Sequence, residues 1–154
     1  MSKEYTCLGM MSGTSGDGVD ASIIQSDGLD RFTILKEQYY EYDKNLFQNY
    51  HDLKKKINSS NDLKKNSSEI KKLENNITIF HAKVVKDITK KFNIELIGFH
   101  GQTIYHNPQE KISLQLGNGN LLSQLTKKKI VFNFRQNDIY NGGEGAPLTP
   151  IFHK

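Results

Sequence analysis

Apolar and polar residues alternate, or form short apolar runs, over the first forty positions, which is typical of β-strands. The pattern predicts strands over Tyr5–Met10, Val19–Gln25 and Arg31–Tyr42. A glycine-rich segment separates the first two strands, and Asp27-Gly28 is a turn signal before the third. We therefore expect an antiparallel meander of three strands at the start of the chain.

The spacing of apolar residues then changes to three and four, which predicts helices. A first helix begins at about Asp43 and has on one face Leu46, Phe47, Tyr50, Leu53 and Ile57. A second, with Asn66 and Glu69 as its predicted capping pair, has an apolar stripe of Ile70, Leu73, Ile77, Phe80, Val84 and Ile88. Asn58–Lys65, between the two helices, is polar and is interpreted as a loop. His81 lies beside the stripe and is interpreted as a packing or surface histidine.

The last third of the chain predicts two buried strands, a shorter strand and one more helix. The buried strands are Ile94–Phe99 and Ile130–Phe134, the shorter strand is Ile112–Leu116, and the helix is Gly117–Lys127. A meander that leads into helix–strand units indicates the α/β class, with a mixed sheet covered by helices.

Composition limits the binding partners and the cellular compartment that the sequence predicts for the protein. The 154 residues suffice for one domain, and the formal charge of +4 comes largely from lysines between Lys54 and Lys91. These lysines are not interleaved with aromatic residues, so a solvated helix face is favoured over a nucleic-acid surface. The single cysteine, Cys7, excludes an intramolecular disulfide and is interpreted as a small core residue. Without an apolar leader or a long apolar span, we expect a cytoplasmic protein that does not insert into membranes.

Met11–Asp20, which reads Met-Ser-Gly-Thr-Ser-Gly-Asp-Gly-Val-Asp, is the most informative segment. Glycine permits positive φ and lets a phosphate approach backbone N–H groups, and the hydroxyl side chains add donors. The two carboxylates, Asp17 and Asp20, suit a phosphate that arrives with a cation, as in magnesium-bound ATP. A glycine-rich hairpin without any ligand is an equally weighted interpretation of the segment alone.

Polar residues also gather after the two predicted buried strands. His100, Gln102 and Thr103 follow the first, where ligands of open α/β sheets bind, and they suit a hydroxyl-rich ligand. A metal site is less favoured because His100 and His106 lack a carboxylate or cysteine at ligand spacing. Asp138 follows the second strand, and its position alone favours a helix N-cap over a general base.

Four motifs occur in the order seen in the bacterial anhydro-N-acetylmuramic acid kinases, and the chain resembles that family from about residue 8 to its end. They are Met11–Asp20, His100–Pro108, Gln115–Asn118 and Phe134–Pro150. The resemblance implies an actin-like ATPase half-domain. It also implies a reaction in which 1,6-anhydro-N-acetylmuramic acid, ATP and water, with Mg²⁺, give N-acetylmuramic acid 6-phosphate and ADP during cell-wall sugar recycling.

The resemblance also implies roles for individual residues. Asp138 becomes the catalytic base, which reverses the preference for an N-cap. The sugar pocket is expected to include His100, Gln102 and Thr103, while Arg135 orients Asp138 or meets an anionic group. The residues expected to hold the phosphates and the hydrated magnesium are Gly13, Thr14, Ser15, Gly16, Asp17, Gly18, Val19 and Asp20. No site formed by metal-ligating side chains alone is expected.

Members of this family are more than twice as long as this chain. We therefore expect residues 1–154 to be the N-terminal domain of a two-domain sugar kinase, inactive without its C-terminal domain; a homodimer is one assembly open to the full-length protein. The alternative is a non-catalytic sugar- or nucleotide-binding module that kept the half-domain. The chain departs from the family pattern at Gly16, usually a larger apolar residue, at Asn133, often aspartate, and at Glu144, usually glutamine.

Overall fold

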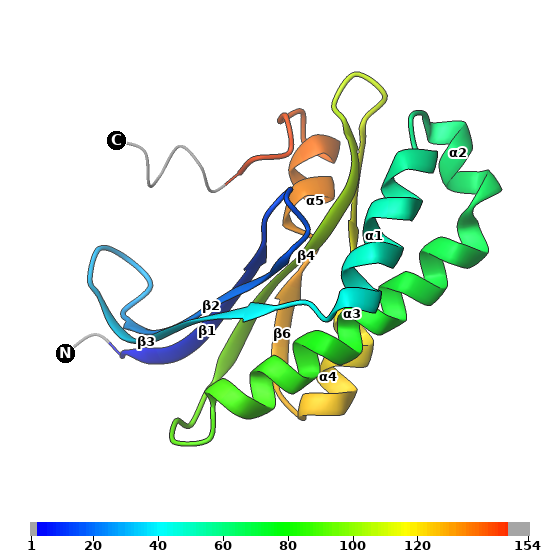
Figure 1. Ribbon diagram of the computed structural model, residues 1–154. Helices are drawn as coiled ribbons and strands as arrows, with labels where there is room; N and C mark the ends of the chain where they lie inside the picture. The colour runs from blue at the N-terminus through cyan, green and yellow to red at the C-terminus, as the bar shows by residue number, and fades with distance from the viewer. Residues whose placement is uncertain (1–2, 148–154) are drawn as a thin grey trace.

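Six strands form one mixed sheet in the computed structural model, which describes residues 3–147 (Figure 1). They are β1 (Tyr5–Ser12), β2 (Gly18–Ser26), β3 (Phe32–Glu41), β4 (Leu96–Asn107), β5 (Ile112–Leu116) and β6 (Lys129–Phe132). β1, β2 and β3 pair antiparallel, so the predicted meander is confirmed. β1 runs parallel to β4, whose other edge pairs first with β6 in parallel and then with β5 antiparallel.

Helices flank this sheet, which confirms the predicted α/β class. They are α1 (Lys44–Lys56), α2 (Ser60–Lys65), α3 (Ser67–Ile88), α4 (Gly119–Thr126) and α5 (Phe134–Tyr140). Figure 1 shows α1, α3 and α4 on the same side of the sheet, with α5 near the turn that joins β1 to β2. α1 begins where the sequence predicts, because the Asp43 carboxylate accepts the Leu46 N–H at 2.9 Å.

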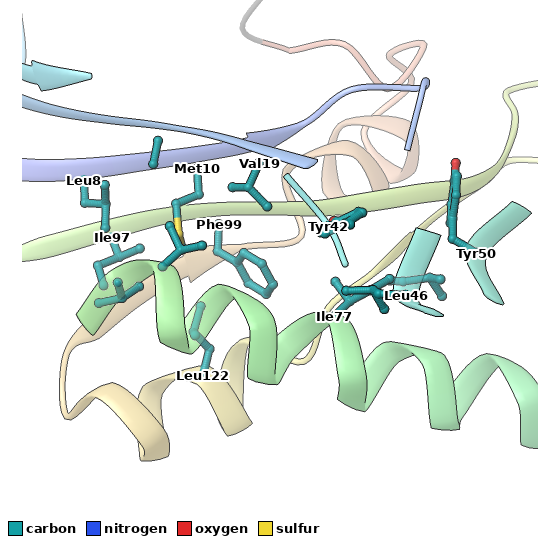
Figure 2. Close-up of a cluster of buried hydrophobic side chains, with 14 of the residues drawn as sticks. Leu8, Met10, Val19, Tyr42, Leu46, Tyr50, Ile77, Ile97, Phe99 and Leu122 are labelled. Carbon is teal, nitrogen blue, oxygen red and sulfur yellow. The ribbon is translucent and has the colours of Figure 1, made fainter. Parts of the chain in front are cut away.

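The core lies between the sheet and these helices. Figure 2 shows Leu8, Met10 and Phe99 pointing from the strands toward the two helices α3, which carries Ile77, and α4, which carries Leu122. All five side chains are at most 3% exposed, and they include apolar positions from two of the three predicted helices and from both central strands. Burial of this contiguous apolar cluster is what orients β1 and β4, the two strands that lead into the candidate site.

Two local predictions between α1 and α3 are wrong. Asn58–Lys65 is not a loop, because Ser59 and Asp62 form a reciprocal capping box that starts α2. Asn66 precedes α3 as predicted, but its side-chain amide donates to the Asp62 carbonyl at 2.8 Å instead of capping the helix.

Three further predictions are wrong in the strands. β4 does not end at Phe99 but continues to Asn107, because pairing with β5 satisfies its second half. β6 ends at Phe132 and is largely exposed rather than buried, because within the described residues it lies at the margin of the sheet and pairs with β4 alone. Cys7 is half-buried rather than a core residue, and its partial burial raises the pKa of the thiol.

Candidate functional site

The turn between β1 and β2 is closed by its own backbone. Gly16 donates its N–H to the Gly13 carbonyl at 3.1 Å and adopts a positive φ of 65°. A Cβ on Gly16 would overlap the ring of Tyr50, which lies directly against it from α1. The family's usual larger residue therefore has no room here, and glycine at this position follows from Tyr50 and from the left-handed backbone.

The outer surface of the turn carries the polar groups that an anion or a hydrated cation would meet. Thr14, Ser15 and Asp17 are exposed, and the Ser15 hydroxyl donates to the Asp17 carboxylate at 2.7 Å. This hydrogen bond lowers the pKa of Asp17, so the carboxylate is charged at neutral pH. Asp20 is also exposed, one residue beyond the fully buried Val19, whose side chain belongs to the core.

Gly18, at the start of β2, closes the turn against β3. A Cβ there would overlap the Tyr40 carbonyl and the ring of Tyr39, so the strand requires glycine. Of the eight residues predicted to hold phosphates and magnesium, the structure thus exposes the side chains of Thr14, Ser15, Asp17 and Asp20. Gly13, Gly16 and Gly18 have no side chains, so they contribute only backbone groups to the turn.

The His100–Thr103 segment lies inside β4, not after it, and its three predicted sugar-binding side chains point in different directions. Gln102 is fully buried, and its amide donates to the Gly13 carbonyl at 2.7 Å, so it contacts the turn. Thr103 is half-buried, and its carbonyl accepts the Tyr50 hydroxyl at 2.8 Å. Only His100 faces the groove described below.

Asp138 lies in the last turn of α5, and the helix N-cap is Asn133. The N-cap interpretation of Asp138 is therefore wrong. Its carboxylate accepts the Gly145 N–H at 2.8 Å, and its carbonyl accepts the Gly143 N–H at 2.9 Å. Asn133 has a positive φ of 65°, which asparagine tolerates better than most residues.

Arg135 connects Asp138 with β4 through two hydrogen bonds. Its Nε donates to His100 Nε2 at 2.7 Å, and its Nη1 donates to the Gly145 carbonyl at 2.8 Å. His100 Nδ1 then donates to the Gly101 carbonyl at 2.8 Å, which fixes the neutral tautomer. Burial, together with the charge of Arg135, lowers the pKa of His100 and keeps the ring neutral. Arg135 thus reaches the Asp138 carboxylate through Gly145.

A groove of about 770 Å³ opens on the face of the sheet away from α1, α3 and α4. Its lining brings together Asp20, His100 and Arg135 with the apolar surface of Met11. Gln102, Thr103 and Asp138 do not line it, so the groove collects only part of the predicted site. All predicted residues share one end of the parallel strands, because β1 and β6 end there and β4 passes through it at His100–Thr103.

Comparisons with known proteins identify the family. A model of the anhydro-N-acetylmuramic acid kinase family matches residues 5–154. The chain belongs to the anhydro-N-acetylmuramic acid kinase family. An anhydro-N-acetylmuramic acid kinase of Pelagibacter ubique is 58% identical over 155 residues, which cover 99% of this chain and 41% of the relative. Those of Agrobacterium fabrum (33% identical; 99% of this chain and 42% of the relative) and Gluconobacter oxydans (38%; 95% and 40%) are also similar.

This member of the anhydro-N-acetylmuramic acid kinase family spans about two fifths of the length of those relatives. The resemblance deduced from the four motifs is confirmed. The end of the fourth motif, Leu148-Thr149-Pro150, lies outside the described residues. Between residues 3 and 147, no helix is long and apolar enough to cross a membrane.

The donor set of the turn suits a magnesium ion that arrives with a nucleotide. Over the described part of the chain, no three histidine, cysteine, aspartate or glutamate side chains group to hold a metal. Mg²⁺ commonly keeps several waters and takes one or two carboxylates along with substrate phosphates. Asp17 and Asp20, exposed on either side of Gly18, offer that kind of partial site.

Sequence reasoning missed two residues beneath the turn. Tyr42 and His81 are buried and hydrogen-bonded to Ser12 at the end of β1. Of the two interpretations of His81, packing is correct because the side chain is fully buried, and the ring also makes two polar contacts. The only available signal was a histidine beside the apolar stripe of a strongly periodic helix.

Proposed function

We propose that residues 1–154 form the N-terminal domain of a two-domain sugar kinase with an actin-like ATPase fold. The complete protein would convert 1,6-anhydro-N-acetylmuramic acid, ATP and water to N-acetylmuramic acid 6-phosphate and ADP. The relatives carry the name of this activity and are more than twice as long as the chain. The sheet order β3-β2-β1-β4, with β6 parallel beyond β4, supports the fold assignment.

One observation carries the proposal: three motif segments follow or occupy the same ends of three parallel strands. The turn follows β1, the His100 segment extends β4, and α5 with Asp138 follows β6. A glycine turn with exposed hydroxyls and carboxylates suits the phosphates of a nucleotide. A carboxylate held by the Gly145 N–H suits a base, and Arg135, which lines the groove beside His100, supplies a guanidinium for polar contacts with a sugar.

In the proposed mechanism, Asp138 accepts a proton from a water molecule. The water oxygen bonds to the anomeric carbon of the sugar, and the bond from that carbon to the bridging O6 breaks. O6 then bonds to the γ-phosphorus of ATP and ADP leaves, so no second carboxylic acid is needed to protonate the leaving oxygen. Backbone N–H groups of the turn other than that of Gly16, which donates to the Gly13 carbonyl, would position the phosphates. Asp17 and Asp20 would hold a hydrated Mg²⁺ that neutralises the charge of the phosphates.

Hydrogen bonds around Asp138 fit this role. The Gly145 N–H stabilises the charged carboxylate at one oxygen, Oδ2. Asp138 accepts no side-chain hydrogen bond from Arg135, which contacts Gly145 instead. Arg135 can therefore orient the carboxylate through Gly145 without forming an ion pair with it.

A chimaera tests the proposal. Residues 1–154 would be joined to the part of the Pelagibacter ubique relative that lies beyond the matched 41% of its length. We expect ATP-dependent formation of the phosphorylated sugar, with ¹⁸O from labelled water incorporated at the anomeric carbon. Asp138→Asn should lower kcat by about 10²- to 10⁴-fold with little change in sugar affinity. Asp52→Asn, an exposed carboxylate on α1, is the matched control and should change neither.

Two outcomes would contradict the proposal. Near-normal turnover of the Asp138→Asn chimaera would remove Asp138 from the mechanism. Calorimetry on the 154-residue chain tests the alternative of a binding module. That alternative would be favoured if the chain bound the anhydro sugar tightly without ATP and the chimaera bound ATP but showed no turnover.

A further inference from the structure

Four polar side chains are buried directly beneath the turn between β1 and β2. Ser12 ends β1, Tyr42 follows β3, His81 lies on α3 and Gln102 lies on β4. Their exposed fractions are 2%, 4%, 0% and 0%. None of these side chains can meet a ligand from this position, so any effect on the site must pass through the backbone.

The four side chains form one connected set of hydrogen bonds, and the donor and acceptor roles are fixed at its His81 and Gln102 ends. His81 Nδ1 donates to the Ile77 carbonyl at 2.8 Å, which leaves Nε2 as an acceptor for the Ser12 hydroxyl at 3.3 Å. The Tyr42 hydroxyl donates to Gln102 Oε1 at 3.2 Å and lies 3.2 Å from Ser12 Oγ, so the single Ser12 hydrogen is shared between the Tyr42 oxygen and His81 Nε2. The Gln102 amide then donates to the Gly13 carbonyl at 2.7 Å. Burial lowers the pKa of His81 to about 4, so the neutral ring that these roles require is present at neutral pH.

Tyr42 also contacts the far end of the turn. Its backbone N–H donates to the Asp17 carbonyl at 2.8 Å. Through Gln102, its side chain therefore acts on Gly13, and through its backbone it acts on Asp17. The turn's internal hydrogen bond, from the Gly16 N–H to the Gly13 carbonyl, lies within the segment that is held at Gly13 and at Asp17.

Packing alone does not account for this network. Apolar side chains of similar shape usually serve a core as well as a buried polar network, or better. In the same region, α3 presents apolar residues such as Ile77 and Val84 to the sheet, while His81 points to Ser12. The polar residues occur where the core meets the turn, and their final donor reaches the turn backbone.

We propose that Ser12, Tyr42, His81 and Gln102 are positioning residues that fix the turn backbone at Gly13 and Asp17. The turn then presents its N–H groups to the phosphates of the nucleotide without having to order on binding. This inference rests on the proposed function for the identity of the anion, while the ordering of the turn stands on the hydrogen bonds alone. Tyr42 is the central member because it touches both ends of the turn.

The test compares two tyrosines that are two residues apart. Tyr42→Phe removes the hydroxyl that contacts Ser12 and Gln102, whereas Tyr40→Phe removes one that donates to Asp87 at 2.9 Å, away from the turn. Amide hydrogen exchange in the ligand-free 154-residue chain would be followed at Gly16 and Tyr42 and, for reference, at Leu8 in the central sheet. We expect about fivefold faster exchange at Gly16 and Tyr42 in Tyr42→Phe, the effect of one hydrogen bond, and no change there in Tyr40→Phe.

Gln102→Met provides a second variant, since it removes the donor to Gly13 with little change in side-chain length. It should accelerate exchange at Gly16 by a similar factor while leaving Leu8 unchanged. Equal acceleration in both tyrosine variants, acceleration throughout the sheet, or no acceleration at the turn would each overturn the proposal.

A separate measurement distinguishes failure of this inference from failure of the proposed function. Magnesium-ATP would be titrated into the chimaera and its Tyr42→Phe and Tyr40→Phe variants. We expect about fivefold weaker binding in Tyr42→Phe alone. If the unmodified chimaera binds no nucleotide, the proposed function is wrong, and the exchange experiment still decides whether the network orders the turn. Equal nucleotide affinity in all three proteins would reject the positioning role.

Discussion

Two glycine-rich segments of the molecule are held in different ways. The turn at residues 13–18 is supported from inside by the buried side chains of Tyr50 and Gln102. The segment at residues 142–147 is held by Asp138 and Arg135, which are half-buried and border the groove side of the sheet. The first segment is therefore supported by the core, and the second depends on side chains that the proposed chemistry also needs. Substitutions that displace the buried supports of the first should cost stability, and substitutions that displace Asp138 in the second should cost activity.

Gly16→Ala should have the largest effect on stability. The substitution forces a Cβ into the ring of Tyr50 at a position with a φ of 65°. Adding the cost of a left-handed alanine to that of overpacking, we expect a loss of about 3–4 kcal/mol in the free energy of unfolding. Urea denaturation measures this loss.

Gly28→Ala is the matched control. Gly28 also has a positive φ, 77°, but a Cβ there would meet nothing within 4 Å. It should lose only about 1 kcal/mol, the backbone contribution. Equal losses of unfolding free energy in both variants would mean that the Tyr50 side chain moves aside at little cost and does not support the turn.

The next largest effect is the pH dependence contributed by His81. Its pKa is lowered to about 4 in the folded chain, against about 6.5 unfolded, so folding favours the neutral ring. The stabilisation is complete above pH 6.5 and is lost as pH falls toward 4, by about 3 kcal/mol in all. His100, whose pKa is also lowered, adds a loss of the same sign and interacts with His81 through charge.

His81→Leu isolates that contribution, because leucine fills the site without titrating. The unfolding free energy of the chain with His81, minus that of His81→Leu, should fall steadily by about 3 kcal/mol from pH 6.5 to pH 4. A difference that stays constant over this range would show that His81 is not held neutral by burial, and it would weaken the assignment of hydrogen-bond direction beneath the turn.

Local periodicity was enough to predict the elements that form the core. The meander, α1, α3 and the first half of β4 follow from apolar spacing, and the residues that produced those predictions, such as Leu8 and Ile77, are fully buried. The extension of β4 and the exposure of β6 were not predictable in this way. They depend on which strands pair with β4, and pairing over long sequence distances leaves little trace in local spacing.

The candidate site likewise contains residues that could be predicted from the sequence and residues that could not. The turn and Asp138 were found from their residue types, since glycine, hydroxyl and carboxylate patterns carry chemical meaning in the sequence. The burial of Gln102 was not foreseeable, because a bulge and a positive φ of 75° at Gly101 redirect the strand between His100 and Gln102. Tyr42 and His81 occupy positions that a periodic pattern assigns to packing, and only the folded chain brings them to Ser12.

Gly143→Ala should have the smallest effect on stability and separates the two segments most sharply. A Cβ on Gly143 would overlap the Asp138 carboxylate, the end of a side chain that can rotate, so we expect a change of only about 0.5 kcal/mol. Rotation would break the bond from the Gly145 N–H and misplace the proposed base, which should lower kcat of the chimaera by about 100-fold. Gly142→Ala provides the reverse case: its φ is 91° and no atom lies within 4 Å of its Cβ, so it should lose about 1 kcal/mol and keep its activity. If Gly143→Ala were instead the less stable and more active of the two, the segment at 142–147 would be a structural element like the turn, and the contrast between the two segments would not hold.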